Sequence, residues 1–140
     1  MNNDELVKIT AGNELMQFLG VKVEVAGADR VVLSMEVTPK VHQYVGIMNG
    51  GVSLYLCETA ASIGVVLGSD LSKVTPVGIE INANHLRAVS RGVIKAEATP
   101  LYPGRTMSVW NIEIRDSREK LICTSRCSIL LRRGGAFPSE

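Results

Sequence analysis

The chain has few cysteines, few aromatic residues and almost no net charge, and these shortages exclude several classes of protein. Its three cysteines, Cys57, Cys123 and Cys127, form an odd set without paired spacing. This favours a reducing cytoplasm over a disulfide scaffold, and we predict that all three thiols fill space in the core. Only His42 and His85 add further soft ligands, so we expect neither a metal site nor a bound cofactor.

The charge pattern and the hydropathy exclude two kinds of partner. A formal net charge of +1 without any block of like charge gives no electrostatic reason to expect nucleic acid or an anionic membrane surface. The first residues are too polar for a signal peptide, and no apolar run reaches the roughly 18 residues of a membrane span. The length of 140 residues and the apolar content of 46% predict one domain over residues 1–140.

Hydrophobic spacing predicts the order of the elements. Residues 4–19 carry apolar groups at a roughly helical spacing, weakened at Gly12, so we expect a helix within residues 1–19. Residues 134–140 have turn composition and are expected to form a loose tail. Residues 71–76 read as a polar connection that ends at Pro76. Strands are predicted at residues 21–26, 30–37, 77–87, 92–101, 106–116 and 120–132.

The segment from Gly50 to Gly68 is apolar except for one charged side chain, Glu58. This composition predicts a helix buried nearly all round. An ionised carboxylate there costs several kcal/mol unless it is compensated, so Glu58 needs a partner, a raised pKa or a water-lined pocket. The last two suit an acid, a base or a nucleophile. Alternatively, the carboxylate reaches solvent past Ser62 or pairs with an arginine.

A single long apolar helix must be shielded from water by other elements of the chain, and this requirement predicts the fold class. We expect an α+β fold in which a curved antiparallel sheet wraps around the buried helix. The edges of such a sheet and a partly apolar outer face at Val109, Ile122 and Leu130 favour oligomerisation.

The start of the apolar helix carries a recognisable pattern. Residues 43–51, Gln-Tyr-Val-Gly-Ile-Met-Asn-Gly-Gly, followed by Glu-Thr-Ala-Ala-Ser at residues 58–62, resemble the hotdog-fold acyl-CoA thioesterases of the phenylacetate-pathway and 4-hydroxybenzoyl-CoA type. The likeness continues in Asn-His-Leu-Arg at residues 84–87 and covers residues 20–132. In that family the catalytic carboxylate comes nine residues after a loop histidine, and here Glu58 comes nine residues after Asn49. Asn49 replaces that histidine, and an amide can donate a hydrogen bond but cannot carry a proton.

The resemblance implies hydrolysis of the thioester of an aryl- or fatty-acyl-CoA to the free acid and CoA. Gly50 and Gly51 open the helix, and the N–H of Gly50 is the implied oxyanion donor. Glu58 acts as nucleophile or general base, and the residues alone leave both routes open. Gln43 orients the water or the thioester carbonyl, and Asn49 keeps a positioning role. Without the resemblance, the glycine pair reads as a tight turn and Gln43 as a solvated loop amide.

Further residues are assigned to the site by the same resemblance. Ser62 follows Glu58 by four residues and can hydrogen-bond to it, although a hydroxyl within a helix also bonds its own backbone. His85 and Arg87 are placed beside the CoA channel, with Arg87 and Arg105 as phosphate-binding candidates. On composition alone, His85 is a satisfied core group and the arginines are surface charges. Only 4% of the residues are aromatic, so the shape of the pocket rather than ring stacking must select the acyl group.

Two questions about assembly and activity remain at this point. The resemblance implies a homodimer or homotetramer with shared active sites, in which Gln43 and Gly50 of one chain face Glu58 of the other. The alternative function is a non-catalytic acyl-CoA-binding hotdog module or sensor, which has no need of a carboxylate in the helix. A hotdog hydratase is a third possibility, but its paired Asp and His motif is not evident.

Overall fold

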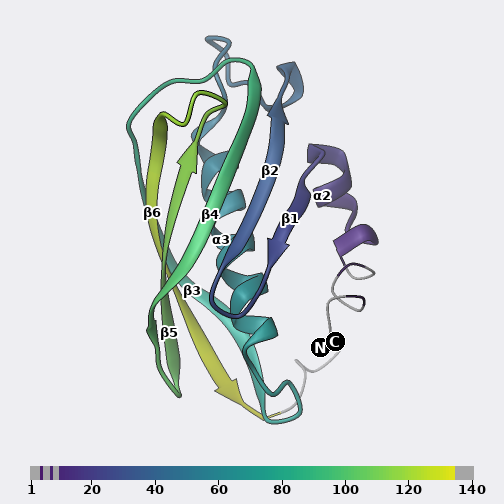
Figure 1. Ribbon diagram of the computed structural model, residues 1–140, viewed down its shortest axis with the longest axis vertical. Helices are drawn as coiled ribbons and strands as arrows, with labels where there is room; N and C mark the ends of the chain where they lie inside the picture. Colours follow the sequence, from purple (N-terminus) through teal and green to yellow (C-terminus); the bar gives the residue numbers. More distant parts are fainter. Residues whose placement is uncertain (1–3, 5–6, 8–9, 135–140) are drawn as a thin grey trace.

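A computed structural model shows one long helix enclosed by a six-stranded antiparallel sheet (Figure 1). It describes residue 4, residue 7 and residues 10–134. The strands lie in the order β1-β2-β4-β5-β6-β3. Their bounds are β1 (Lys22–Ala26), β2 (Val31–Val37), β3 (Val74–His85), β4 (Gly92–Pro103), β5 (Met107–Arg115) and β6 (Leu121–Arg133). The helices are α2 (Glu14–Leu19), the short 3-10 helix η1 (Pro39–Val41) and α3 (Gly50–Leu67).

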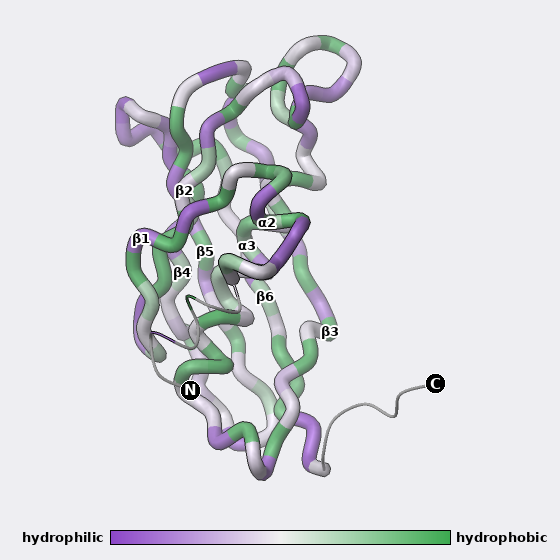
Figure 2. The backbone as a smooth tube through the Cα atoms, turned by 90° about the vertical axis from the view of Figure 1, so that its right-hand side faces the viewer, coloured by the Kyte–Doolittle hydropathy of each residue, from purple (hydrophilic) through white to green (hydrophobic). Residues whose placement is uncertain are grey.

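The sheet curves around α3. Viewed from the side, β1 and β2 lie on one side of α3 and β6 and β3 lie on the other, while α2 crosses the remaining open side (Figure 2). Every strand contacts α3, so the helix organises the whole core. This confirms the α+β arrangement that the sequence predicts.

The core lies between α3 and the inner face of the sheet. At Gly64 the helix approaches β5 so closely that a Cβ would overlap the ring of Trp110. The indole of Trp110 is 2% exposed, and its Nε1 donates a hydrogen bond to Ser108 Oγ at 2.9 Å. Glycine at this position therefore sets the spacing between helix and sheet.

The predicted strands are confirmed, but β3 begins earlier than expected. It starts at Val74, so Pro76 lies within the strand instead of ending a polar connection. β3 is an edge strand of the sheet, and proline is tolerated there because its missing N–H leaves no gap in an interior ladder. The ladder with β6 is also irregular between Gly78 and Glu80.

The predicted N-terminal helix is interrupted. Residues 10 and 11 are helical, but Asn13 is not, and its Oδ1 accepts a hydrogen bond from Met16 N at 3.0 Å. An asparagine in this role starts a new helix, α2, which ends at Gly20 with φ of 70°. Residues 5–6 and 8–9 of the predicted helix and residues 135–140 of the predicted tail lie outside the described residues.

The prediction that α3 is buried nearly all round is confirmed only in part, because its residues other than the exposed Gly51 are divided between buried and half-buried ones. Its buried residues are Ser53, Leu56, Cys57, Ala60, Ala61, Ile63, Gly64 and Val65. The side toward α2, where Ile63 lines the larger cavity, is only partly covered. Among the described helices, α3 alone has the length and mean hydropathy, 1.5, of a membrane span, and in this fold it is the helix that packs on the sheet.

The prediction of a partly apolar outer face at Val109, Ile122 and Leu130 is wrong for Ile122 only, because Val109 is half-buried on the outer side of β5. Ile122 is only 2% exposed, whereas Leu130 is 37% exposed. Charged pairs occupy the outer surface of the central strands, with Arg30–Glu97 at 2.8 Å and Arg115–Glu113 at 2.7 Å. The strict alternation in these strands sends charged side chains outward and leaves few apolar groups for a partner at the centre of this face.

Candidate active site

Asn49 caps the N-terminus of α3 and leaves one backbone donor free. Its Oδ1 accepts a hydrogen bond from Gly51 N at 2.8 Å, and its carbonyl oxygen accepts one from Val52 N at 3.0 Å. No residue in the described part of the chain accepts a hydrogen bond from Gly50 N–H. The first N–H groups of a helix lack intrahelical partners, so Gly50 presents the donor that remains for a ligand.

The loop before α3 holds Gln43 near this donor. Gln43 N donates a hydrogen bond to Ile47 O at 2.8 Å, and Gln43 Oε1 accepts one from Val45 N at 2.5 Å. Gly46 completes the turn with φ of 82°. Because Oε1 is engaged within the loop, the Nε2 group of Gln43 is the end left to donate to a ligand.

A cavity of about 370 Å³ lies at this end of α3. Gln43, Gly50, His85 and Arg87 line it together, so four of the predicted site residues meet. Asn49 is not among its lining residues. The side chain of Asn49 therefore acts as a helix cap here, and its predicted positioning role finds no geometric support.

His85, at the end of β3, lies directly over Gly50. A Cβ built on Gly50 would lie 2.8 Å from His85 Nε2 and 3.0 Å from His85 Cε1. Any side chain at position 50 would displace the imidazole, so close approach explains this glycine better than a tight turn does. The reading of His85 as a satisfied core group is wrong, because its ring is exposed and faces the cavity.

Glu58 lines a second, larger cavity of about 770 Å³ on the open side of α3. Its walls are mostly apolar and come from α2, α3 and the start of β3, and Ser62 lies in the same wall. Glu58 is half-buried, and it makes no hydrogen bond or ion pair with any residue in the described ranges. Of the alternatives for this carboxylate, the open cavity is the one that the structure supports.

The two cavities divide the predicted site within one chain. Gly50 and Glu58 are eight residues apart on α3, which is about 12 Å along the axis at about 1.5 Å per residue. Arg105, on the turn between β4 and β5, lines neither cavity. Gly51 lines neither, and its N–H is already bound by the cap.

Sequence reasoning missed residues that surround Glu58. A Cβ on Gly78 would overlap the Oε1 atom of Glu58, so the carboxylate lies against bare β3 backbone. A glycine inside a predicted strand indicates that another group can approach the backbone closely at that position. Tyr55 and Thr59 share the wall of the larger cavity, and Met16 of α2 closes it. Helical spacing could have identified Tyr55, three residues before Glu58, and Thr59, three residues before Ser62, but not Met16, whose contact is tertiary.

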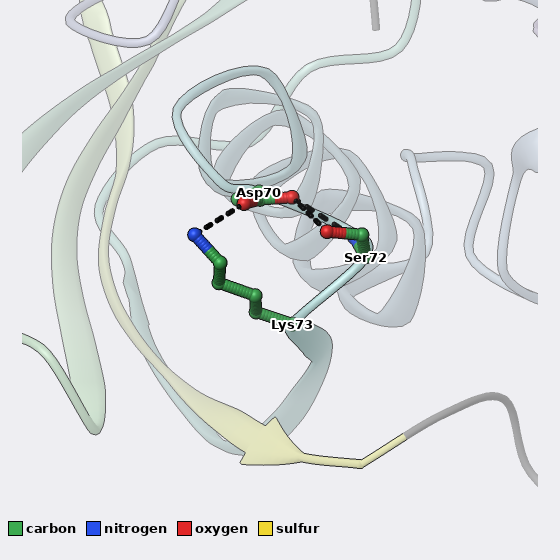
Figure 3. Close-up of polar contacts among 3 residues, drawn as sticks. All are labelled: Asp70, Ser72 and Lys73. Atoms are coloured by element: carbon green, nitrogen blue, oxygen red, sulfur yellow. Dashed lines mark hydrogen bonds and ion pairs between the residues drawn. The ribbon is translucent and has the colours of Figure 1, made fainter.

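The turn between α3 and β3 is fixed by Asp70 (Figure 3). Its carboxylate accepts hydrogen bonds from Ser72 Oγ at 2.6 Å and Ser72 N at 3.1 Å, and it pairs with Lys73 Nζ at 2.9 Å. The hydrogen bonds from Ser72 and Lys73 lower the pKa of Asp70 to about 2. Leu71 and Val74 of the same turn line the larger cavity, so Asp70 holds one part of its rim.

The three thiols are free and buried, as predicted. The hydrogen bond with Cys123, together with burial, raises the pKa of Cys57 far above its usual range. Burial, with smaller effects from the carboxylates of Glu58 and Glu80, raises the pKa of Cys127 to about 12. Since only a thiolate is an effective nucleophile, Cys57 and Cys127 are not candidates for that role.

Comparison with known proteins identifies the family of this arrangement. The family model described as Thioesterase superfamily matches residues 45–123. The chain is 40% identical over 119 residues to the 1,4-dihydroxy-2-naphthoyl-CoA hydrolase of Listeria monocytogenes. This match covers 85% of this chain and 96% of the relative. It is 44% identical over 115 residues to the putative esterase ComA2 of Bacillus subtilis. This match covers 82% of this chain and 91% of the relative.

Solved structures agree with the fold. The crystal structure of the thioesterase HI1161 from Haemophilus influenzae superposes with a TM-score of 0.86 at 35% identity. The match covers 95% of this chain and 92% of that chain. The curved sheet around one helix is therefore the hotdog fold.

Proposed function

The chain belongs to the thioesterase superfamily, and on that premise we propose that it hydrolyses an acyl-CoA thioester to the free acid and CoA. The observation that carries the proposal is the position of Glu58. It is the one charged side chain of α3, it lies in the wall of a largely apolar cavity, and no described cation neutralises it. A carboxylate held in this way is suited to attack a carbonyl carbon or to activate water.

We assign the N–H of Gly50 to the thioester oxygen. It is the free backbone donor at the positive end of the α3 dipole, and the absence of a side chain lets a substrate come close. Negative charge develops on this oxygen in the transition state, so a fixed donor lowers the barrier by a few kcal/mol. The Nε2 group of Gln43 lies in the same cavity and orients the carbonyl or the attacking water.

Two routes are open to Glu58. As a general base it takes a proton from water, whose oxygen then attacks the carbonyl carbon. As a nucleophile its own oxygen attacks and forms a mixed anhydride, which water later cleaves. In both routes the carbon–sulfur bond breaks and the electron pair leaves with sulfur. Ser62 follows one turn after Glu58 in the same wall and helps to hold the carboxylate or the water.

We propose that each active site is shared between two chains of a homodimer, with a homotetramer as the further option. Within one chain, Gly50 and Glu58 line different cavities, so neither cavity alone contains both the donor and the carboxylate. A second chain can supply the missing half if Gln43 and Gly50 of one chain face Glu58 of the other. The free edge of β3 and the uncovered side of α3 provide surface for such a pair.

The walls of the larger cavity support our proposal for the substrate class. Its apolar lining and its volume of about 770 Å³ suit an aryl or a fatty acyl group. The aryl class has the stronger support, because a relative at 40% identity is named as a hydrolase of an aromatic acyl-CoA. Arg87, beside the smaller cavity, is our candidate for binding a CoA phosphate, and Arg105 is a second one that a partner chain would have to bring near. Three free thiols fit a cytoplasmic enzyme.

The decisive experiment is release of free thiol from a panel of acyl-CoAs. Benzoyl-, naphthoyl- and straight-chain acyl-CoAs of increasing length are compared at equal concentration, with heat-denatured protein as the blank. We expect catalytic release, with aryl esters cleaved fastest. Tight binding of acyl-CoA without turnover for any ester would contradict the proposal and support a non-catalytic binding module.

A further inference from the structure

The short helix α2 closes one side of the larger cavity. It crosses the open side of α3 (Figure 2), and its residues Leu15 and Met16 line the cavity together with Asn13, which caps the helix. Glu58 lines the same cavity from α3. An acyl group that extends from Glu58 and fills this cavity is therefore bounded by side chains of α2.

Met16 is buried, but it lies outside the main core. Its side chain belongs to a residue that is 5% exposed, whereas the neighbouring Leu15 is 50% exposed. Leu19, one turn later on α2 and 8% exposed, packs into the core cluster around α3, and Met16 does not. Leu19 in turn does not line the larger cavity. The two buried side chains of α2 thus have different surroundings: one anchors the helix and the other faces the cavity.

The backbone of Met16 is fixed without help from its side chain. Met16 N donates a hydrogen bond to Asn13 Oδ1 at 3.0 Å, and Met16 O accepts one from Val21 N at 2.9 Å. With Leu19 packed in the core, α2 keeps its place through contacts that do not involve the Met16 side chain. Truncation at position 16 should therefore enlarge the cavity instead of releasing the helix.

We propose that Met16 sets the length of the acyl group that the larger cavity accepts. This inference rests on the proposed thioester hydrolysis and adds a specificity-determining residue to it. A methionine side chain is unbranched and fills irregular apolar space, so it can form a close wall against an alkyl or aryl group. One methylene of misfit in an apolar pocket changes kcat/KM by about 10 to 200-fold, which is enough to select among acyl groups.

The test measures fit without turnover. Ketone analogues of acyl-CoA, in which a methylene replaces the thioester sulfur, are titrated as a straight-chain series from butanoyl to hexadecanoyl. We expect the parent protein to show an optimum chain length. Met16→Ala should move this optimum about two to three carbons longer, because it removes Cγ, Sδ and Cε, and should bind the longer chains about tenfold more tightly than the parent does. Met16→Phe should move it shorter, and Met16→Leu, of similar volume, should keep it.

Leu19→Ala is the matched control. It also truncates a buried side chain of α2 and should lower the urea midpoint, but it should leave the optimum length where the parent has it. An equal shift in both alanine variants, no shift in either Met16→Ala or Met16→Phe, or a parent without an optimum would overturn the role of Met16.

Thiol release from the matching thioesters separates this inference from the proposed function. Turnover by the parent with an unchanged optimum in the Met16 variants would refute the role of Met16 alone. A shifted optimum in binding without turnover by the parent would refute the hydrolysis and leave Met16 as the wall of an acyl-binding cavity.

Discussion

The carboxylate of Glu58 on α3 lies against the bare backbone of Gly78 on β3. A methyl group at position 78 would overlap Glu58 Oε1, so the glycine leaves the space that the carboxylate fills. The irregularity of the β3–β6 ladder begins at this residue. The position of the candidate catalytic group thus depends on a residue of another element that carries no side chain.

Gly78→Ala should lower kcat by about 10²-fold, because the methyl group pushes the carboxylate out of place and small displacements of a reacting group are costly. Thiol release measures this effect. The free energy of unfolding should also fall, and by less when Glu58 is truncated to Ala, since the truncation removes the overlap. Equal destabilisation in both backgrounds would show that the contact with Glu58 is not the cause.

Glu58→Gln should lower turnover by about 10²-fold or more while acyl-CoA still binds. The amide keeps the shape of the side chain but can neither attack the carbonyl carbon nor accept a proton from water. Steady-state thiol release and equilibrium binding of a substrate analogue measure the two effects. Glu36→Gln, an exposed position on β2, is the matched control. Near-normal turnover by the Glu58 variant would refute the assignment.

Asn49→His, which restores the family's residue, should change activity by no more than about tenfold, since a positioned hydrogen bond is worth on the order of 1 kcal/mol. It should also destabilise the protein by about 1 kcal/mol, because the cap at Gly51 N is lost. Urea unfolding measures the second effect, and Asn49→Asp keeps a capping oxygen as its control. A gain of several orders of magnitude would instead identify this chain as a weakened enzyme and favour the binding module.

Mixed oligomers test the shared site. Glu58→Gln and Gln43→Ala subunits should each be nearly inactive alone. If one chain supplies Gln43 and Gly50 and the other supplies Glu58, hybrids contain some sites with both intact halves and regain a fraction of the activity. The subunits are mixed after reversible unfolding and assayed for thiol release. An active monomer in sedimentation, or hybrids without recovery, would contradict the arrangement.

The contribution of Asp70 to the stability of the protein should depend on pH. This residue lies in the turn that borders the larger cavity. Its pKa is lowered to about 2, whereas an unfolded aspartate has a pKa of about 3.9. Its contribution to stability is therefore present above about pH 4 and is lost as the pH falls toward 2. Asp70→Asn should be less stable than the parent at pH 7, and the difference in urea midpoint should shrink between about pH 4 and pH 2. A difference that does not change with pH would contradict this.

Local patterns in the sequence determined most of the fold. Strand-like segments bounded by turn residues located all six strands, with strict alternation in the first, and the apolar run located α3 with its one charge at Glu58. The errors arose where a partner element decides the outcome. Pro76 reads as a loop residue until β3 is known to be an edge strand. Ile122 reads as outward-facing because only tertiary packing shows that it is buried.

The sequence predicts candidate residues for the site, but it does not predict how the fold groups them. Spacing along the chain relates Asn49 to Glu58, yet in the folded chain Asn49 caps the helix and lines neither cavity, whereas Glu58 lines the larger one. The contact between His85 and Gly50 joins residues 35 positions apart in the sequence, and nothing in the spacing of either one indicates it.

The place of β3 in the sheet has a consequence for synthesis on the ribosome. β3 follows α3 directly in the chain, but its hydrogen-bonded neighbour is β6, the last strand, which ends at Arg133. Until that strand emerges, a nascent chain has made its most apolar helix and an edge strand that nothing pairs. Chaperones that bind exposed apolar segments can act in this interval, and the sheet closes only when nearly the whole domain has been translated.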